Sequence, residues 1–189
     1  MSIDTSAAAR VQDLSGNYNL DPSHSRIGFV TRHAMIAKVR GAFNDVSGTA
    51  SINGADPAAS SLEVTIQTAS VDTRDANRDG HLASPDFFDA ATFPTITFKG
   101  TGFAITADDT VEVTGDLTIK GITKQVTVPF EFGGVATDPF GNSRVGFEGQ
   151  VVVNRKDWGL TWNAALETGG VLVADTVTLE LEVSAVKAA

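Results

Sequence analysis

The chain has 189 residues, enough for one domain with a substantial core, and 42% of its residues are apolar. Its formal net charge of -9 argues against a nucleic-acid partner and against docking of a basic patch on anionic lipid. The absence of cysteine excludes disulfides, thiol catalysis and zinc–cysteine sites.

Residues 1–15 have neither the cationic start nor the apolar segment of an export signal, so we expect a flexible tail followed by one domain, residues 16–189. No apolar run approaches the roughly 18 residues that a membrane-spanning helix requires. The sequence therefore predicts a soluble, cytoplasmic protein without stable membrane insertion.

Alternation of apolar and polar side chains recurs along the chain and is most regular from Val111 to Lys120. A period of two is typical of a strand with one buried and one exposed face. The expected strands are Tyr18–Leu20, Ser25–His33, Val39–Ile52 with a bulge near Val46–Gly48, Leu62–Thr68, Thr95–Lys99, Phe103–Ile105, Val111–Lys120, Gln125–Phe132, Arg144–Arg155, Leu160–Trp162 and Thr176–Val186. Because little amphipathic helix is available to cover them, their apolar faces must meet in a sandwich or a closed barrel.

The interval Val71–Ala91 lacks alternation, and we expect one or two short helices there, over one end of the sheet. Within it, Asp75 to Asp86 has the oxygen, glycine and apolar spacing of an EF-hand calcium loop. The twelfth position is Asp rather than Glu, and flanking amphipathic helices are missing. A solvated, self-capped helical connection is therefore favoured, and we expect this segment not to bind calcium.

Few residues indicate catalysis, since nucleophile-elbow, phosphate-loop, dinucleotide and zinc-protease motifs are all missing. His24, His33 and His81 are too far apart for a metal motif, and separate structural roles are favoured. His33 is expected on the strand face of Phe29, where a buried imidazole needs a partner: a ligand head group, an internal Asp or a backbone carbonyl.

Short motifs that are weak alone, but specific in their order and spacing, run from Tyr18 to about Val186. They are Asp21-Pro22-Ser23-His24-Ser25 with Phe29 and His33; Gly41 and Phe43; Arg78-Asp79-Gly80-His81-Leu82 to Asp86-Phe87-Phe88-Asp89; Phe93-Pro94-Thr95-Ile96-Thr97-Phe98; Gly115 to Lys124; Gly146-Phe147; and Asn154-Arg155-Lys156-Asp157-Trp158-Gly159. In these motifs the chain resembles the YceI-like, polyisoprenoid-binding family.

The resemblance implies an all-β fold: an extended, lipocalin-like barrel of eight antiparallel strands with one or two short helices between strands. Its interior would hold the tail of an isoprenoid or a similar amphiphile. The resemblance also accounts for the Asp75–Asp86 segment, since its Arg-Asp-x-His-Leu piece is part of the family pattern without a metal.

The expected function is non-enzymatic binding, storage or transport of a polyisoprenoid, an isoprenoid quinone or a similar lipophilic molecule, by a monomer or a homodimer and without a cofactor. The side chains expected to contact the ligand are Phe29, His33, Phe43, Phe98, Val113, Leu117, Val126, Val128, Phe147, Trp158 and Trp162. For the two tryptophans, a place in the core is the alternative. Two other functions remain open: an enzyme acting on a bound lipid with His33 as acid or base, and a filled barrel serving as an interaction module.

Overall fold

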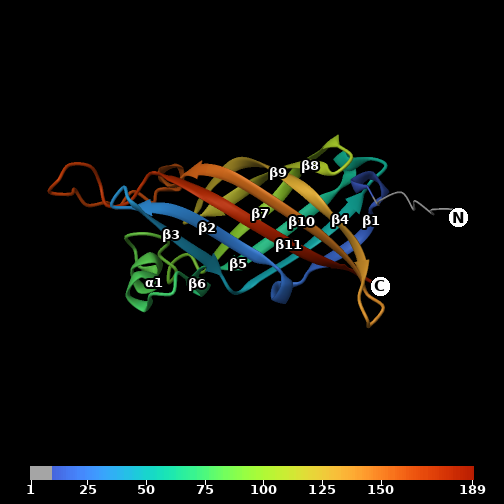
Figure 1. Ribbon diagram of the computed structural model, residues 1–189, viewed down its shortest axis with the longest axis horizontal. Coiled ribbons are helices and arrows are strands. Elements are labelled where there is room, and N and C mark those ends of the chain that lie inside the picture. The colour runs from blue at the N-terminus through green and yellow to red at the C-terminus, as the bar shows by residue number, and fades with distance from the viewer. Residues whose placement is uncertain (1–9) are drawn as a thin grey trace, which may run out of the picture.

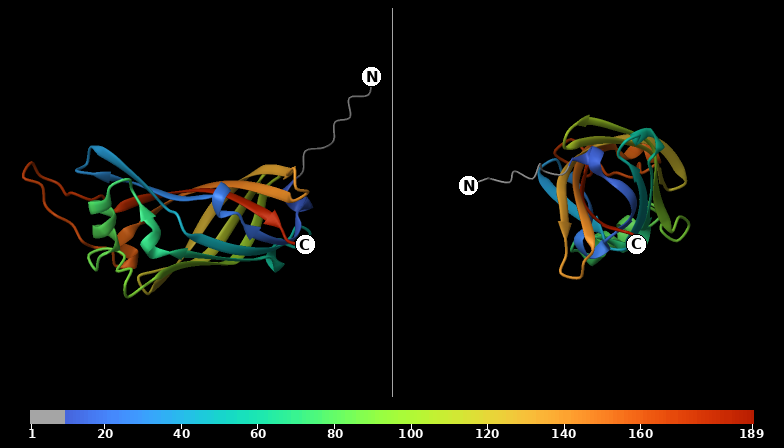
Figure 2. Two further views of the ribbon diagram at one scale, coloured as in Figure 1. Left: turned by 90° about the horizontal axis from the view of Figure 1, so that it is seen from below. Right: turned by 90° about the vertical axis from the view of Figure 1, so that its right-hand side faces the viewer.

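The computed structural model describes residues 10–189 and shows an antiparallel sheet that closes into an elongated barrel (Figure 1). Along the barrel axis the strands form a ring (Figure 2). The eight strands of the ring are, in spatial order, β1 (Ser15–Leu20), β4 (Val46–Asn53), β5 (Ser61–Gln67), β7 (Thr95–Ala107), β8 (Thr110–Ile119), β9 (Ile122–Thr137), β10 (Ser143–Asn154) and β11 (Thr176–Lys187). Pairing of β1 with β11 closes the ring, which confirms the predicted fold class.

Three further strands lengthen the barrel at the end opposite the two described termini: β2 (Arg26–His33), β3 (Ala37–Phe43) and the short β6 (Val71–Asp72). β1 and β2 pair with successive parts of β11, and β3 pairs with β2 and β6. The prediction of one strand over Val39–Ile52 with a bulge near Val46 is wrong. The chain breaks at Asn44–Asp45, because β3 and β4 pair with different neighbours on either side of that point.

Two other strand predictions also change. The segments Thr95–Lys99 and Phe103–Ile105 are one strand, β7, whose register shifts between Gly100 and Gly102. Leu160–Trp162 does not form a strand, because its carbonyls accept hydrogen bonds from the Arg155 side chain instead of joining a ladder.

The predicted short helix is present as α1 (Ala76–Ala83), which lies at the end of the barrel reached by β2 and β3 (Figures 1 and 2). Asp75 caps it by accepting a hydrogen bond from the Arg78 backbone N–H. Most of the Asp75–Asp86 segment is therefore a self-capped helical connection and not an EF-hand loop. Asp79 instead accepts from Thr73, and Asp86 contacts His81.

Short 3₁₀ turns complete the connections. They are η1 (Val11–Asp13), η2 (Pro22–His24), η3 (Pro57–Ala59), η4 (Thr68–Ser70) and η5 (Arg155–Trp158). Within residues 10–189, no helix is long and apolar enough to cross a membrane.

The N-terminal segment closes one end of the barrel. Residues 1–9 of the predicted tail lie outside the described residues. Residues 11–15 are not a flexible tail, because the side chains of Val11 and Leu14 are buried and Ser15 begins β1. An added Cβ on Gly54 would stand 2.7 Å from the Gln12 carbonyl carbon, so this segment packs directly on the β4–β5 connection.

Phenylalanine rings lie over inward-facing glycines of the barrel wall. Phe98 covers Gly115 and Phe29 covers Gly41, where an added Cβ would stand 2.7 and 2.8 Å from ring carbons. Phe103 lies in the same way over Gly100, and Phe130 over Gly149. Each ring occupies the space that a side chain would fill, so the rings line the wall and leave the axis of the barrel open.

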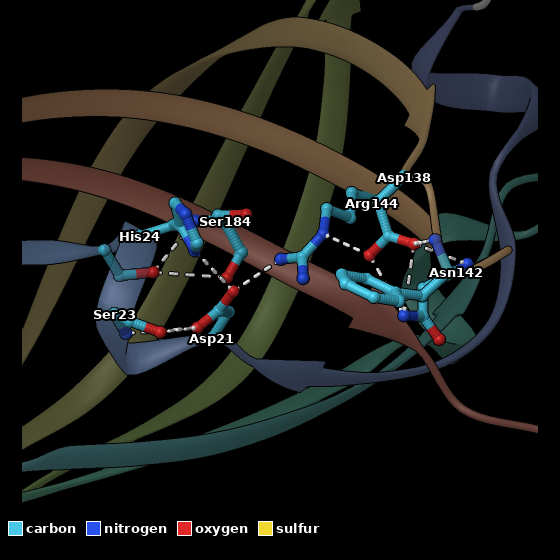
Figure 3. Close-up of polar contacts among 9 residues, drawn as sticks. Asp21, Ser23, His24, Asp138, Asn142, Arg144 and Ser184 are labelled. Carbon is cyan, nitrogen blue, oxygen red and sulfur yellow. Dashed lines mark hydrogen bonds and ion pairs between the residues drawn. The ribbon is translucent and has the colours of Figure 1, made fainter.

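A polar cluster on the outer surface joins the β1–β2 turn to the β9–β10 hairpin (Figure 3). Asp21 accepts hydrogen bonds from both the backbone and the hydroxyl of Ser23, contacts His24 Nδ1 at 2.8 Å and forms an ion pair with Arg144. The side-chain hydrogen bond from Ser23, then those from Arg144 and His24, hold the pKa of Asp21 well below its usual range.

The same guanidinium also binds Asp138, with Nε 2.9 Å from Oδ2 (Figure 3). Hydrogen bonds from Asn142, and then from Arg144, lower the pKa of Asp138 to about 2. The two carboxylates in turn raise the pKa of Arg144. The Asp-Pro-Ser-His motif therefore anchors the turn at which the chain passes from β1 to β2.

We expect Gly115→Ala to destabilise the protein by about 1–3 kcal/mol, the usual effect of overpacking. The added methyl would meet the Phe98 ring and also stand 2.6 Å from the Lys99 carbonyl oxygen, a backbone atom that cannot turn aside. Urea denaturation measures the difference. Gly146→Ala is the matched control, because an added Cβ there meets nothing within 4 Å. Equal stability of the two variants would contradict close ring-on-glycine packing.

We expect Arg144→Gln to lower the free energy of unfolding at pH 7 and to weaken its dependence on acid pH. Asp21 and Asp138 have depressed pKa values in the folded protein, whereas an aspartate of the unfolded chain has a pKa near 3.9. The two residues therefore stabilise the fold fully when the pH is above that value, and this stabilisation is lost as the pH falls toward 2. Without Arg144 the folded-state pKa values of Asp21 and Asp138 rise toward the unfolded-state value. The variant therefore loses less stability than the parent between about pH 5 and pH 2.

Urea denaturation at pH 7, 5, 4 and 3 tests this, with Lys124→Gln as the control for loss of an exposed cation. An acid dependence as steep in Arg144→Gln as in the parent protein would assign the effect to other carboxylates.

Candidate ligand-binding cavity

A cavity of about 340 Å³ runs along the inside of the barrel. At one end its walls include Val11 and Leu14, and at the other Leu82 and Trp158. The alternation of the strands creates it, because every second side chain of each strand points inward. An eight-stranded barrel is just wide enough to fill with side chains or to hold one small ligand. In this barrel the inward side chains leave a cavity and do not fill the interior.

The cavity wall is almost entirely apolar. Its inward side chains from the middle of the strands are aliphatic or aromatic: Ile27, Phe29, Val64, Phe98, Val113, Leu117, Val126, Val128, Phe147, Leu179 and Leu181. Polar side chains occur mainly towards the ends of the barrel, such as Asn53 at the end of β4, Ser60 just before β5 and Arg155 after β10. The wall thus suits a long apolar molecule whose polar group, if it has one, lies near an end.

Among the described residues, the cavity wall contains one charged side chain, that of Arg155. Only 6% of its surface is exposed. Its guanidinium donates to the carbonyls of Leu160 and Trp162 at 2.5 and 2.9 Å and to that of Ala174 at 2.9 Å. Burial lowers its pKa, whereas Asp175, 3.7 Å away, acts in the opposite direction. Because carbonyl oxygens already engage its donors, Arg155 holds the β10–β11 connection against the barrel end.

Trp158 closes the cavity beneath that connection. It is 2% exposed, and its indole Nε1 donates to the Leu117 carbonyl at 2.9 Å. Since the polar atom of the ring is satisfied by the wall, the ring presents its apolar surface to the cavity. The sequence left two places open for Trp158, the core and the ligand site. In the structure the residue is both buried in the core and part of the cavity wall.

Tyr18 adds a hydroxyl near the opposite end. Its side chain is buried in the wall, and burial raises its pKa. A phenolic hydroxyl can donate or accept a hydrogen bond, so Tyr18 adds a polar group to an otherwise apolar part of the wall. Sequence reasoning missed Tyr18 and Arg155 as wall residues. Alternation could have found both, because Tyr18 faces the same side as Leu20, and Arg155 continues the inward series of Val151 and Val153.

Nine of the eleven side chains expected to contact a ligand lie in the cavity wall. They are Phe29, Phe43, Phe98, Val113, Leu117, Val126, Val128, Phe147 and Trp158. The structure brings these residues together from six strands and one 3₁₀ turn.

His33 and Trp162 lie elsewhere. His33 follows the alternation of β2, but the β2–β3 hairpin extends past the barrel, so the imidazole is exposed beside Val173. Trp162 packs behind the wall, with its ring centroid 4.6 Å from that of His81 and 5.4 Å from that of Phe87. Alternation predicts which face a side chain takes, but not where the barrel ends.

Comparison with known proteins gives a consistent result. The family model of the YceI-like domain matches residues 18–185. A UPF0312 protein of Azotobacter vinelandii is 38% identical over 151 residues, which cover 79% of each chain. The crystal structure of BcnA from Burkholderia cenocepacia is similar with a TM-score of 0.76 and 28% identity, covering 87% of this chain and 98% of BcnA.

A polyisoprenoid binding domain from Saccharophagus degradans, implicated in plant cell wall breakdown, has the same fold. Its TM-score is 0.70 at 19% identity, over 90% of this chain and 98% of that domain. Together with the barrel geometry, the match over residues 18–185 and the similarity to the Azotobacter protein lead to one assignment: the chain belongs to the YceI-like family.

Proposed function

We propose that this protein binds one lipophilic molecule, a polyisoprenoid, an isoprenoid quinone or a similar amphiphile, inside the barrel and stores or carries it without chemical change. The observation that carries the proposal is the apolar cavity of about 340 Å³ along the barrel axis. This volume lies within the range of about 300–1,000 Å³ that is common for small-molecule sites.

The energetics of burial support an apolar ligand. Removing one methylene-sized group from water contributes at most ~0.8 kcal/mol, so a five-carbon unit contributes up to ~4 kcal/mol before association costs. Two or three well-buried units therefore reach about -8 kcal/mol, which corresponds to micromolar binding. Because the tail supplies this affinity, a polar anchor is not required. The polyisoprenoid binding of the Saccharophagus degradans domain, which shares the fold, favours an isoprenoid tail.

The two other functions have less support. An enzyme with His33 as acid or base would need that imidazole beside the ligand, whereas His33 is exposed outside the cavity wall. A filled barrel would need inward side chains that meet at the axis. The glycine positions beneath Phe98 and Phe29 favour the opposite arrangement, because they let the rings lie against the wall.

We expect a lipophilic compound to co-purify with protein from its own host. An empty apolar cavity loses dispersion contacts along its whole lining, so an available lipid should occupy it. Native mass spectrometry followed by organic extraction should detect and release a prenyl or fatty compound. A protein that is ligand-free and also fails to bind an added fluorescent prenyl probe would contradict the proposal.

We expect Val113→Trp to abolish binding of a fluorescent prenyl probe while the protein remains folded. Val113 is buried in the cavity wall, and an indole there would cross the lumen. In a packed core such overpacking destabilises by ~1–3 kcal/mol, but a cavity can accept the ring for less.

Glu112→Trp is the matched control, because the neighbouring side chain points outward and is exposed. We expect it to bind the probe as the parent does. Thermal melting monitors the fold of both variants. A folded Val113→Trp protein that binds the probe normally would show that the lumen is not the binding site.

A further inference from the structure

The tip of the β2–β3 hairpin exposes two large apolar side chains. Met35 is 63% exposed and Ile36 is 81% exposed. Tight hairpin turns usually carry Asn-Gly or Asp-Gly, since those residues tolerate positive φ and solvent. Here Ala34 and Met35 adopt φ values of 51° and 62°, so apolar side chains occupy positions that are unfavourable both in backbone conformation and in hydration.

A second segment is held beside this tip. The backbone N–H of Ala34 donates to the Leu172 carbonyl at 2.7 Å, and that of Ala174 donates to the Arg32 carbonyl at 3.1 Å. Val171, in the same segment, is 41% exposed. The two segments together form one apolar tip, which we define as residues 34–37 and 164–172. It projects from the end of the molecule opposite β1 and the C-terminus (Figures 1 and 2).

Positive charge is concentrated behind the tip, in a chain with a net charge of -9. Residues 22–44 contain four arginine or lysine residues and no Asp or Glu: Arg26, Arg32, Lys38 and Arg40. The side chains of Arg26 and Arg40 approach Glu180 at 4.0 and 3.1 Å. In residues 164–172 the acidic residue is Glu167.

Arg32 and Lys38 are directly opposite each other across the hairpin, and both are exposed. Within the described part of the chain neither forms an ion pair, and Arg32 Nη1 reaches only the Ile36 carbonyl, at 3.4 Å. Like charges in such a cross-strand pair are destabilising unless an anion lies nearby. This pair therefore points to an anionic partner directly behind the apolar tip.

The tip adjoins the end of the ligand cavity. Thr31, in β2, and Val173, in the neighbouring segment, both line the cavity, and Val173 forms a bridge with His33 at the base of the tip. A surface that receives the tip would therefore lie close to one end of the lumen.

We propose that the apolar tip docks on the surface of an anionic phospholipid bilayer. Met35, Ile36 and Val171 would enter the boundary between head groups and acyl chains, while Arg32 and Lys38 contact lipid phosphates. This inference rests on the proposed function, because docking at this end would let a lipophilic molecule move between bilayer and cavity without crossing water. The acidic remainder of the protein would stay away from the membrane and orient the barrel.

Co-sedimentation with large unilamellar vesicles tests the proposal. The parent protein should bind vesicles of phosphatidylcholine and phosphatidylglycerol (3:1) more tightly than vesicles of phosphatidylcholine alone. The double variant Arg32→Gln/Lys38→Gln should bind the anionic vesicles about 25-fold more weakly, from about fivefold for each cation near the surface. Met35→Ser/Ile36→Ser should bind them at least tenfold more weakly, since both apolar side chains are lost.

Matched controls lie at the opposite end of the barrel. Phe140→Ser removes a side chain that is 89% exposed in the β9–β10 turn, and Arg10→Gln/Lys187→Gln removes two cations near the described termini. Both controls should bind vesicles like the parent. Unchanged melting temperatures would exclude unfolding, because none of these side chains is in the core.

Three results would overturn the docking proposal: no vesicle binding by the parent, equal binding to neutral and anionic vesicles, or equal losses in the tip and control variants. The fluorescent prenyl probe separates this outcome from failure of the proposed function. A protein that binds the probe but not vesicles retains the proposed function without docking. One that binds anionic vesicles through the tip, but not the probe, retains docking without the ligand.

Discussion

The open lumen depends on phenylalanine rings that lie over inward-facing glycines. A ring of eight strands has an interior that ordinary side chains would fill. At Gly41, Gly100, Gly115 and Gly149 the wall lacks a side chain, and a ring from the neighbouring strand or from nearby in the same strand occupies that place. The same contacts that bury the aromatic surface therefore keep the axis free, so stability and cavity volume come from one packing arrangement.

The two ends of the barrel are closed by different chemistry. At one end Val11 and Leu14 pack on the β4–β5 connection, so the closure is apolar and uses backbone contact at Gly54. At the other, Arg155 organises the β10–β11 connection through carbonyl hydrogen bonds, and α1 lies alongside. The second end also has the exposed apolar tip and the two cations, Arg32 and Lys38, that form no ion pair within residues 10–189. The proposed docking of the tip would place this end, and not the other, at the bilayer.

Net charge is an average over the whole surface and hides its distribution. A value of -9 argues against docking on anionic lipid, yet residues 22–44 carry only positive charge. Strand pairing then sets Arg32 opposite Lys38 and places both next to Met35 and Ile36. Composition alone cannot reveal this arrangement, because charge patches depend on which segments lie together in three dimensions.

The sequence by itself determined most of the strands and which of their side chains share a face. The alternation from Val111 to Lys120 has a local cause, since successive side chains of a strand point to opposite sides. Eight of the expected side chains lie on strands and in the cavity wall for this reason, and the ninth, Trp158, lies in η5. The tertiary structure alone decided where the barrel ends, which left His33 outside, and where β3 passes into β4 at a change of pairing partners. Those features depend on contacts between residues distant in the sequence, such as Arg155 with the Ala174 carbonyl, and a local pattern carries no information about them.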